Sequence, residues 1–335
     1  MAHGMDLDLS KIRWEDHPRN PLIEPPRPEW MIADPSVLPP KKTRDGLWHL
    51  FANSIGFINH YVSRDGITWE KLGARCFQGI RPFLYTEGGQ YYLFYERFRR
   101  PWRSGIVVRR SLDLVDWSAP VEVLEAARET DGGFPRFLGN PCLVKDEPAG
   151  YRLYFSGGWV FLKDCLYFEP RHIGVASASA VLGPYDRHPS WLLSPDSGRE
   201  HHSLGAGAIK IIRRPSTWWI FNNGIFRDHQ GRSRSAIMLY ESHDGLCLAP
   251  DRGTLVVTPG AGWKRAFVYA CAPVLHDGMI YLYYNARDGW FRGRERIGLA
   301  IGRMPRGGDL LEEPTPVVEP CVKPLSKPAV EQSTP

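Results

Sequence analysis

The segment 33–51 reads ADPSVLPPKKTRDGLWHLF, and its organisation recurs four more times along the chain. A small or polar residue leads into a short apolar run, a turn follows, and a second run is dense in Tyr, Trp, Phe and Leu. The other copies are 81–95 (RPFLYTEGGQYYLFY), 140–155 (NPCLVKDEPAGYRLYF), 207–221 (GAIKIIRRPSTWWIF) and 272–284 (APVLHDGMIYLYY). Short apolar runs bounded by turn residues are typical of β-strands, so each copy predicts a strand pair.

A third strand-like piece follows each pair. The clearest is 61–69 (YVSRDGITW), and its Ser-x-Asp pattern recurs at Ser111 and Ser242. Five such units at roughly 60-residue spacing suit the blades of a propeller, which bury their faces against one another around a ring. A β-sandwich has no reason to repeat an aromatic strand five times. The sequence therefore predicts an all-β fold, a five-bladed β-propeller with almost no helix.

The rest of the chain fits one catalytic domain spanning residues 1–312. Segment 11–30 is rich in Pro and contains Trp14, and we expect it to pair with the last blade and close the ring, which removes an exposed edge. Residues 313–335 lack any pattern and are predicted to form a Pro-rich tail.

Composition excludes several classes. The 42 Lys and Arg exceed the 37 Asp and Glu by five, but they form no dense basic stripe, so we expect no nucleic-acid partner. No apolar run is long enough to span a membrane, and no signal peptide is visible. The six Cys lack zinc-ligand spacing and favour a reducing compartment. We expect a cytoplasmic protein, with an extracellular location left open; the oligomeric state is not indicated.

In a propeller, first strands begin and second strands end at the same mouth of the central channel. The first set of residues is Asp34, Arg81, Asn140, the segment 200–202 and Tyr269. The second set is Asn53, Glu96–Arg97, the segment 157–159, Asn222–Asn223 and the segment 285–288. Carboxylates, amides, guanidinium groups and a Trp gathered in one place suit sugar hydroxyls and sugar faces, so we expect a carbohydrate substrate.

The motif ADPSV at 33–37 resembles the first-blade motif of glycoside hydrolase family 43 and its five-bladed relatives, families 32, 68, 117 and 130. There the Asp is the general base of inverting enzymes or the nucleophile of retaining ones, so the resemblance implies that Asp34 is catalytic. Two departures mark a divergent member. Asn140 stands where family 43 has an Asp, and the segment 204–207 (LGAG) lacks the Glu that opens the family's fourth blade.

The general acid is therefore left open. Glu200 is the first candidate and Glu96 the second, and His201 or His202 is a further donor, because imidazolium is a competent acid near neutral pH. The predicted substrate-binding residues are Asn53, Arg81, Arg97, Asn140, Trp159, His201, Asn222, Tyr269, Arg287 and Asp288. Trp290 is a further candidate for stacking on a sugar.

Three functions fit these residues. The first is an inverting glycoside hydrolase that acts on a terminal sugar. The second is a glycoside phosphorylase or transferase in the same pocket. One interpretation of the arginines near Glu96 is that they bind a carboxylate, sulfate or phosphate of an anionic carbohydrate substrate, and the other is that they form a solvated basic loop. The first interpretation allows a phosphorylase, to whose anion site Arg287, Arg292 and Arg294 would add. The third is a catalytically inactive propeller that binds sugar or protein. No loop has calcium-ligand spacing and no cofactor motif is present, so we predict neither a metal nor a cofactor.

Overall fold

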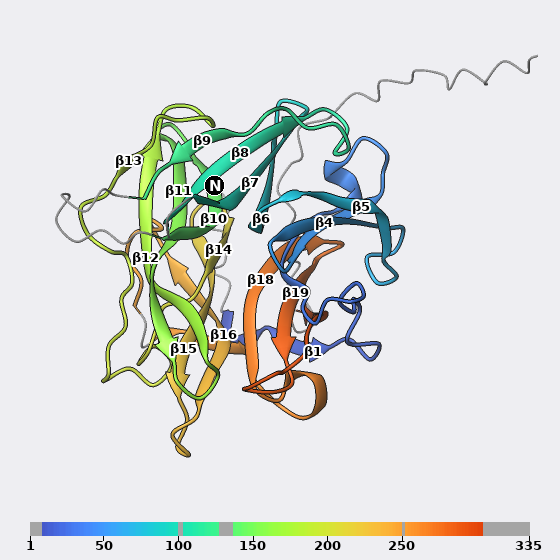
Figure 1. The fold of residues 1–335 in the computed structure, drawn as a ribbon. Coiled ribbons are helices and arrows are strands. Elements are labelled where there is room, and N and C mark those ends of the chain that lie inside the picture. Colours follow the sequence, from blue (N-terminus) through green and yellow to red (C-terminus); the bar gives the residue numbers. More distant parts are fainter. Residues whose placement is uncertain (1–8, 100–102, 127–136, 250–251, 304–335) are drawn as a thin grey trace, which may run out of the picture.

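The computed structural model describes residues 9–99, 103–126, 137–249 and 252–303; the predicted tail 313–335 lies outside these ranges. Five antiparallel four-stranded sheets form the blades of a propeller, which confirms the predicted fold class (Figure 1). The described ranges contain no α-helix, and their short 3-10 helices include Leu9–Lys11, Pro40–Lys42 and Gly262–Lys264. None of the helices found there could cross a membrane.

Each blade uses consecutive strands. The first blade comprises β2 (Ala33–Leu38), β3 (Trp48–Ser54), β4 (Phe57–Ser63) and β5 (Glu70–Gln78). The second comprises β6 (Ile80–Glu87), β7 (Gln90–Arg99), β8 (Arg103–Ser111) and β9 (Val121–Leu124). The third comprises β10 (Leu138–Asp146), β11 (Gly150–Leu162), β12 (Tyr167–Ala178) and β13 (Asp186–Arg187).

The fourth and fifth blades complete the ring. The fourth comprises β14 (Ile209–Arg213), β15 (Trp218–Arg227), β16 (Ser233–Ser242) and β17 (Thr254–Val257). The fifth comprises β18 (Phe267–His276), β19 (Met279–Arg287), β20 (Glu295–Arg303) and, as its outer strand, β1 (Arg13–Asp16). The innermost strands β2, β6, β10, β14 and β18 contact one another in that order, and β18 returns to β2.

The N-terminal segment closes the ring. β1 pairs antiparallel with β20, placing Trp14 opposite Gly302. Isolated bridges join Ile23 to Ile297 and Met31 to Glu295, so the chain runs along β20 before it enters the first blade. The edge of the last blade is thereby paired by residues from the other end of the sequence.

Five apolar clusters hold the blades together, one at each interface between neighbours. Phe51 of β3 and Leu93 of β7, for example, belong to the cluster between the first two blades. Trp219 of β15 and Leu282 of β19 belong to the cluster between the last two. The recurring aromatic run is therefore the second strand of a blade, buried on both faces, where each large side chain contributes about 1.5–3 kcal/mol.

The recurring Ser-x-Asp pattern forms a tight turn after the third strand. The Asp65 carboxylate accepts hydrogen bonds from the backbone N–H groups of Ile67 (2.8 Å) and Thr68 (2.7 Å). Asp113 and Asp244 make the equivalent bonds in their blades. These aspartates are used for turn formation and do not line the central cavity.

Candidate active site at the propeller axis

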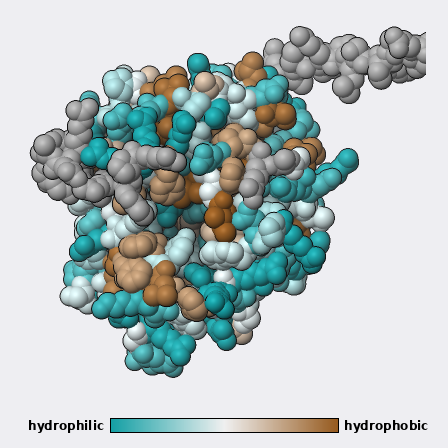
Figure 2. Space-filling view, viewed as in Figure 1, coloured by the Kyte–Doolittle hydropathy of each residue, from teal (hydrophilic) through white to brown (hydrophobic). Residues whose placement is uncertain are grey.

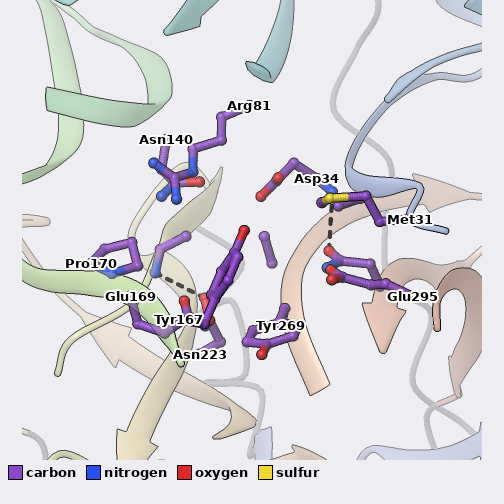
Figure 3. A pocket seen from close by; sticks show the side chains of 15 residues that line it. Met31, Asp34, Arg81, Asn140, Tyr167, Glu169, Pro170, Asn223, Tyr269 and Glu295 are labelled. Atoms are coloured by element: carbon purple, nitrogen blue, oxygen red, sulfur yellow. Dashed lines mark hydrogen bonds between the residues drawn. The ribbon is translucent and has the colours of Figure 1, made fainter. Parts of the chain in front are cut away.

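A polar cavity lies on the axis and receives residues from all five blades (Figure 3). Its lining consists of Met31, Ala33, Asp34, Arg81, Asn140, Tyr167, Glu169, Pro170, Gly207, Ala208, Asn223, Tyr269, Ala270, Asn285 and Glu295. The face of the molecule shown in Figure 2 is mostly hydrophilic and is hollowed near its centre.

A shared backbone kink aims three of these side chains at the axis. Asp34, Arg81 and Asn140 each precede a proline and have φ of 53°, 56° and 51°. Each also lies at a register shift of its innermost strand. The left-handed conformation costs a residue with a side chain about 1–2 kcal/mol. Gly207 takes the same conformation in the fourth blade, where no side chain enters from this position.

Asparagine side chains hold these kinks in place. The Asn285 Oδ1 accepts a hydrogen bond from the backbone N–H of Asp34 (3.1 Å), and the Asn53 Oδ1 accepts one from Arg81 (2.7 Å). The Asn223 Oδ1 likewise accepts a hydrogen bond from the backbone N–H of Ala208 (2.8 Å). The first two bonds join neighbouring blades, so these amides fix the position of the cavity-facing residue in the next blade.

Three carboxyl groups face this cavity, those of Asp34, Glu169 and Glu295. Burial raises the pKa of Glu169 to about 7, against the opposing effects of Arg81 and a hydrogen bond with Tyr269. Burial raises the pKa of Glu295 to about 8, although Arg287 opposes the shift. The pKa of Asp34 is also raised by burial, while Arg81 and Lys210 favour its ionised form. At neutral pH the cavity therefore retains exchangeable protons.

The buried charges around the cavity do not balance if every group is ionised. Four carboxyls, those of Asp34, Glu96, Glu169 and Glu295, face the three cations Arg81, Lys210 and Arg287. Because an uncompensated charge is costly in a buried site, the group is most stable with at least one carboxyl protonated.

The cations are already engaged. Arg81 Nη1 lies 2.6 Å from Glu96 Oε2, and the Glu96 side chain is fully buried. Lys210 donates from Nζ to the backbone oxygen of Pro141 at 2.9 Å. Burial lowers the pKa of Lys210, and Asp34 opposes that shift. Among the described residues that line the cavity, Arg81 is the only cation.

Of the residues that the sequence placed at this mouth, Asp34, Arg81, Asn140, Asn223, Tyr269 and Asn285 line the cavity. Glu96 is buried behind it as the partner of Arg81, and Arg287 is buried near Glu295. Asn53 is the buried amide that holds Arg81. These positions agree with the expectation that strand ends converge at one mouth, but they leave the catalytic roles as predictions.

His202 and Asn222 form a buried pair outside the lining, with His202 Nε2 2.7 Å from Asn222 Oδ1. The Asn222 Nδ2 donates to the backbone oxygens of Ala206 (2.7 Å) and Ala208 (2.8 Å). Burial lowers the pKa of His202. This pair supports the backbone that opens the fourth blade, which is a positioning role.

The remaining predicted residues do not line the cavity. Glu200 and Arg97 are exposed, and His201 is half-buried against Phe226. Asp288 binds Arg296 at 2.8 Å. Trp159 stacks on Phe137 with ring centroids 3.5 Å apart, so one face of its ring is covered.

Tyr167, Glu169 and Glu295 line the cavity but were missed from the sequence. All three lie near the start of a third strand, Tyr167 and Glu169 in β12 and Glu295 in β20. Third strands begin where second strands end, so the same reasoning extended by one strand would have found them. Among the described residues, no group of three or more His, Cys, Asp and Glu could hold a metal ion.

No family model matches the chain. A curated 1,2-β-oligomannan phosphorylase from Thermoanaerobacter sp. (strain X514) is 22% identical over 290 residues, covering 78% of this chain and 87% of that protein. The β-1,2-mannobiose phosphorylase of Listeria innocua, solved with β-1,2-mannobiose, superposes with a TM-score of 0.61 at 12% identity, covering 87% and 97% of the two chains. The α-L-arabinanase of Cellvibrio cellulosa, solved with arabinohexaose, gives 0.58 at 17% identity, covering 80% and 91%.

The fold is a glycoside hydrolase-like propeller. Its structural neighbours include both hydrolases and a phosphorylase, all at low identity, so this chain is a divergent form of that architecture. The expected resemblance to families 43 and 130 is therefore confirmed at the level of the fold.

Proposed function

We propose that the protein hydrolyses a glycosidic bond of a carbohydrate held in the axial cavity. The observation that carries this proposal is the set of three carboxyls on one cavity, two of which have their pKa raised to about 7 and about 8. Glycoside hydrolysis requires one carboxyl that donates a proton and one carboxylate that accepts one. A cavity that holds protons at neutral pH supplies the first. We assign the second role to Asp34: burial raises the pKa of its carboxyl, but Arg81 and Lys210 favour the ionised form.

Glu169 is our general acid. Figure 3 shows it on a different side of the cavity from Asp34, as the two groups that flank a scissile bond must be. Glu295 instead accepts a hydrogen bond from the Nδ2 of Asn285, whose Oδ1 holds the backbone of Asp34. Glu200 remains a prediction, but its exposed side chain lies outside the lining.

The proposed reaction is a single displacement with inversion. Asp34 takes a proton from a water molecule, and the water oxygen bonds to the anomeric carbon. The bond from that carbon to the leaving oxygen breaks as Glu169 donates its proton to that oxygen. The products are a free sugar of inverted configuration and a shortened glycan. The position of Asp34 in the ADPSV motif supports its assignment as the base.

We further propose that the enzyme removes a terminal sugar. The cavity is lined by all five blades and by Met31 of the closing segment, an arrangement that surrounds one sugar more readily than it admits a continuous chain. Tyr167 and Tyr269 provide aromatic surface within the lining.

Phosphorolysis is the second candidate, favoured by the similarity to a 1,2-β-oligomannan phosphorylase. The charges of the cavity oppose it. A phosphate attacking the anomeric carbon would lie among three carboxyls, and Arg81, the one cation of the described lining, is paired with Glu96. Hydrolysis needs no additional anion, so it fits this charge distribution better.

The test is turnover of aryl glycosides and oligosaccharides with and without phosphate, in the wild type and in Asp34→Asn, Glu169→Gln and the surface control Glu241→Gln. Hydrolysis predicts phosphate-independent turnover that Asp34→Asn abolishes and Glu241→Gln preserves, with NMR showing inversion at the anomeric carbon. Turnover that requires phosphate would establish the second candidate. Sugar binding without turnover by the wild type would refute both.

A further inference from the structure

Three arginines surround one tryptophan near the mouth of the cavity. The guanidinium carbons of Arg232 and Arg234 lie 4.6 Å from the centre of the Trp290 ring, and that of Arg265 lies 6.0 Å from it. We call these four residues the Trp290 arginine cluster. The Trp290 Nε1 donates to the backbone oxygen of Ser233 at 2.8 Å, so the ring is held in place.

The cluster adjoins the cavity. Trp290 lies in the connection from β19 to β20, between Arg287 and the cavity-lining Glu295. Its side chain packs against the apolar group that includes Tyr167 and Tyr269, which also line the cavity. A glycan whose terminal sugar occupies the cavity would therefore pass close to these arginines as it leaves.

The positive charge of the cluster is not neutralised within the described residues. Arg234 binds Asp228 at 2.8 Å, whereas Arg232 and Arg265 form no ion pair in the part of the chain that the structure describes. Arg232 and Arg265 are both exposed. The Arg265 Nε–H donates a hydrogen bond to the backbone oxygen of Asp288 (2.9 Å), and this bond orients the Arg265 guanidinium group. Two like charges held against one ring repel each other, and an anion bound between them would relieve that repulsion.

We propose that Arg232 and Arg265 bind the carboxylate of an acidic sugar in the part of the glycan that leaves the cavity. This inference rests on the proposed function, because it assumes a carbohydrate in the cavity. Guanidinium groups bind carboxylates through paired N–H donors. Because the Arg265 Nε is hydrogen-bonded to Asp288, the terminal Nη groups of Arg265 and the guanidinium of Arg232 are the donors that we assign to the carboxylate. A free phosphate that attacks the anomeric carbon belongs in the cavity, whereas Trp290 lies outside its lining.

The experiment is calorimetric binding of galacturonate and alginate oligosaccharides, each compared with the same preparation after reduction of its carboxyls to alcohols. The wild type should bind at least one acidic preparation about tenfold more tightly than its reduced counterpart, which is about 1.4 kcal/mol. The double variant Arg232→Gln/Arg265→Gln should lose that preference and keep its affinity for the reduced preparation. The preference should also shrink between about 20 and 200 mM salt, because the site is exposed.

Arg213→Gln is the matched control. The Arg213 guanidinium also stacks on a tryptophan, Trp218, at 4.8 Å, but it lies at the end of β14 that is remote from the cavity-lining Ala208. Equal affinity of the wild type for acidic and reduced preparations overturns the inference, as does an acidic preference that survives the double variant. Inorganic phosphate that binds in place of every acidic sugar also overturns it. If saccharides are cleaved without any acidic preference, only this inference fails; if none is bound or cleaved, the proposed function fails too.

Discussion

Replacing Glu169 with Gln should stabilise the protein while it removes the proposed acid. The Glu169 side chain is only 5% exposed, and burial raises its pKa from 4.5 to about 7. The window between these values is about 2.5 pH units wide, and about 1.4 kcal/mol per unit gives roughly 3 kcal/mol. Gln resembles the protonated carboxyl in shape, so the variant keeps the packing but avoids the cost of ionisation.

Because the folded state raises the pKa of Glu169, the stability difference between Glu169→Gln and the wild type depends on pH. Below about pH 4.5 Glu169 is protonated in both states, and the variant gains nothing. Between pH 4.5 and 7 the unfolded chain releases the proton while the folded chain retains it, so the stability of the wild type falls relative to the variant. Above about pH 7 both states are ionised and the difference stays near 3 kcal/mol.

Urea unfolding at half-unit steps from pH 5 to 8.5 measures this directly and needs no substrate. The stability of Glu169→Gln minus that of the wild type should grow from about 1 to about 3 kcal/mol over this range. Glu241→Gln is the control, because its side chain is exposed and its difference should stay small and flat. A Glu169→Gln difference that is independent of pH would refute the claim that this carboxyl is buried with a raised pKa.

Four further predictions follow from the same contacts. For substrates with poor leaving groups, kcat/KM should fall as pH rises above about 7, because Glu169 must be protonated to donate its proton. Measured pH–rate profiles should show a smaller fall in kcat/KM for substrates with good leaving groups. Arg81→Met should cost about 3–5 kcal/mol in urea unfolding by leaving Glu96 buried without its partner, and adding Glu96→Gln should restore most of that loss. Gly139→Ala should lower the melting temperature, because the new methyl group would collide with the Glu96 carboxylate. Trp14→Ala should lower the free energy of unfolding by about 3 kcal/mol in calorimetry, because Trp14 of the closing strand β1 packs edge-on against Phe221.

The five-bladed fold could be predicted from the sequence because the same packing requirement recurs in every blade. Every blade needs a central strand buried between two neighbours, and that need places Phe51, Phe94, Tyr154, Phe221 and Tyr283 in the interface with the following blade. Five copies of one signal outweigh the ambiguity of any single apolar run. Asp34, Arg81 and Asn140 were found for the same reason, since they occupy one repeated position before a proline.

The position of the proposed acid could have been found by extending the topological argument to third strands, but its burial and raised pKa are not local properties of the sequence. Glu169 follows Tyr167 and Phe168 and precedes Pro170, and this local sequence does not mark its carboxyl as buried. Its pKa is raised mainly by burial and also by the charge of Asp34 in the first blade, while Arg81 of the second blade and a hydrogen bond with Tyr269 of the fifth oppose the shift. Glu200 attracted attention because it precedes the fourth blade, yet no other blade covers it.

The cavity is therefore a site that the rest of the ring must stabilise. Three left-handed residues cost about 1–2 kcal/mol each, and one ionised Glu169 costs roughly 3 kcal/mol more above neutral pH. These costs are of the same size as the contribution of a few buried aromatic side chains at the blade interfaces. Closure by β1 adds Trp14 to one of those interfaces and pairs the exposed edge of β20. A weakened closing strand should accordingly lower the stability that supports the strained axial residues, so that Trp14→Ala and the cavity variant Glu169→Gln act on stability in opposite directions.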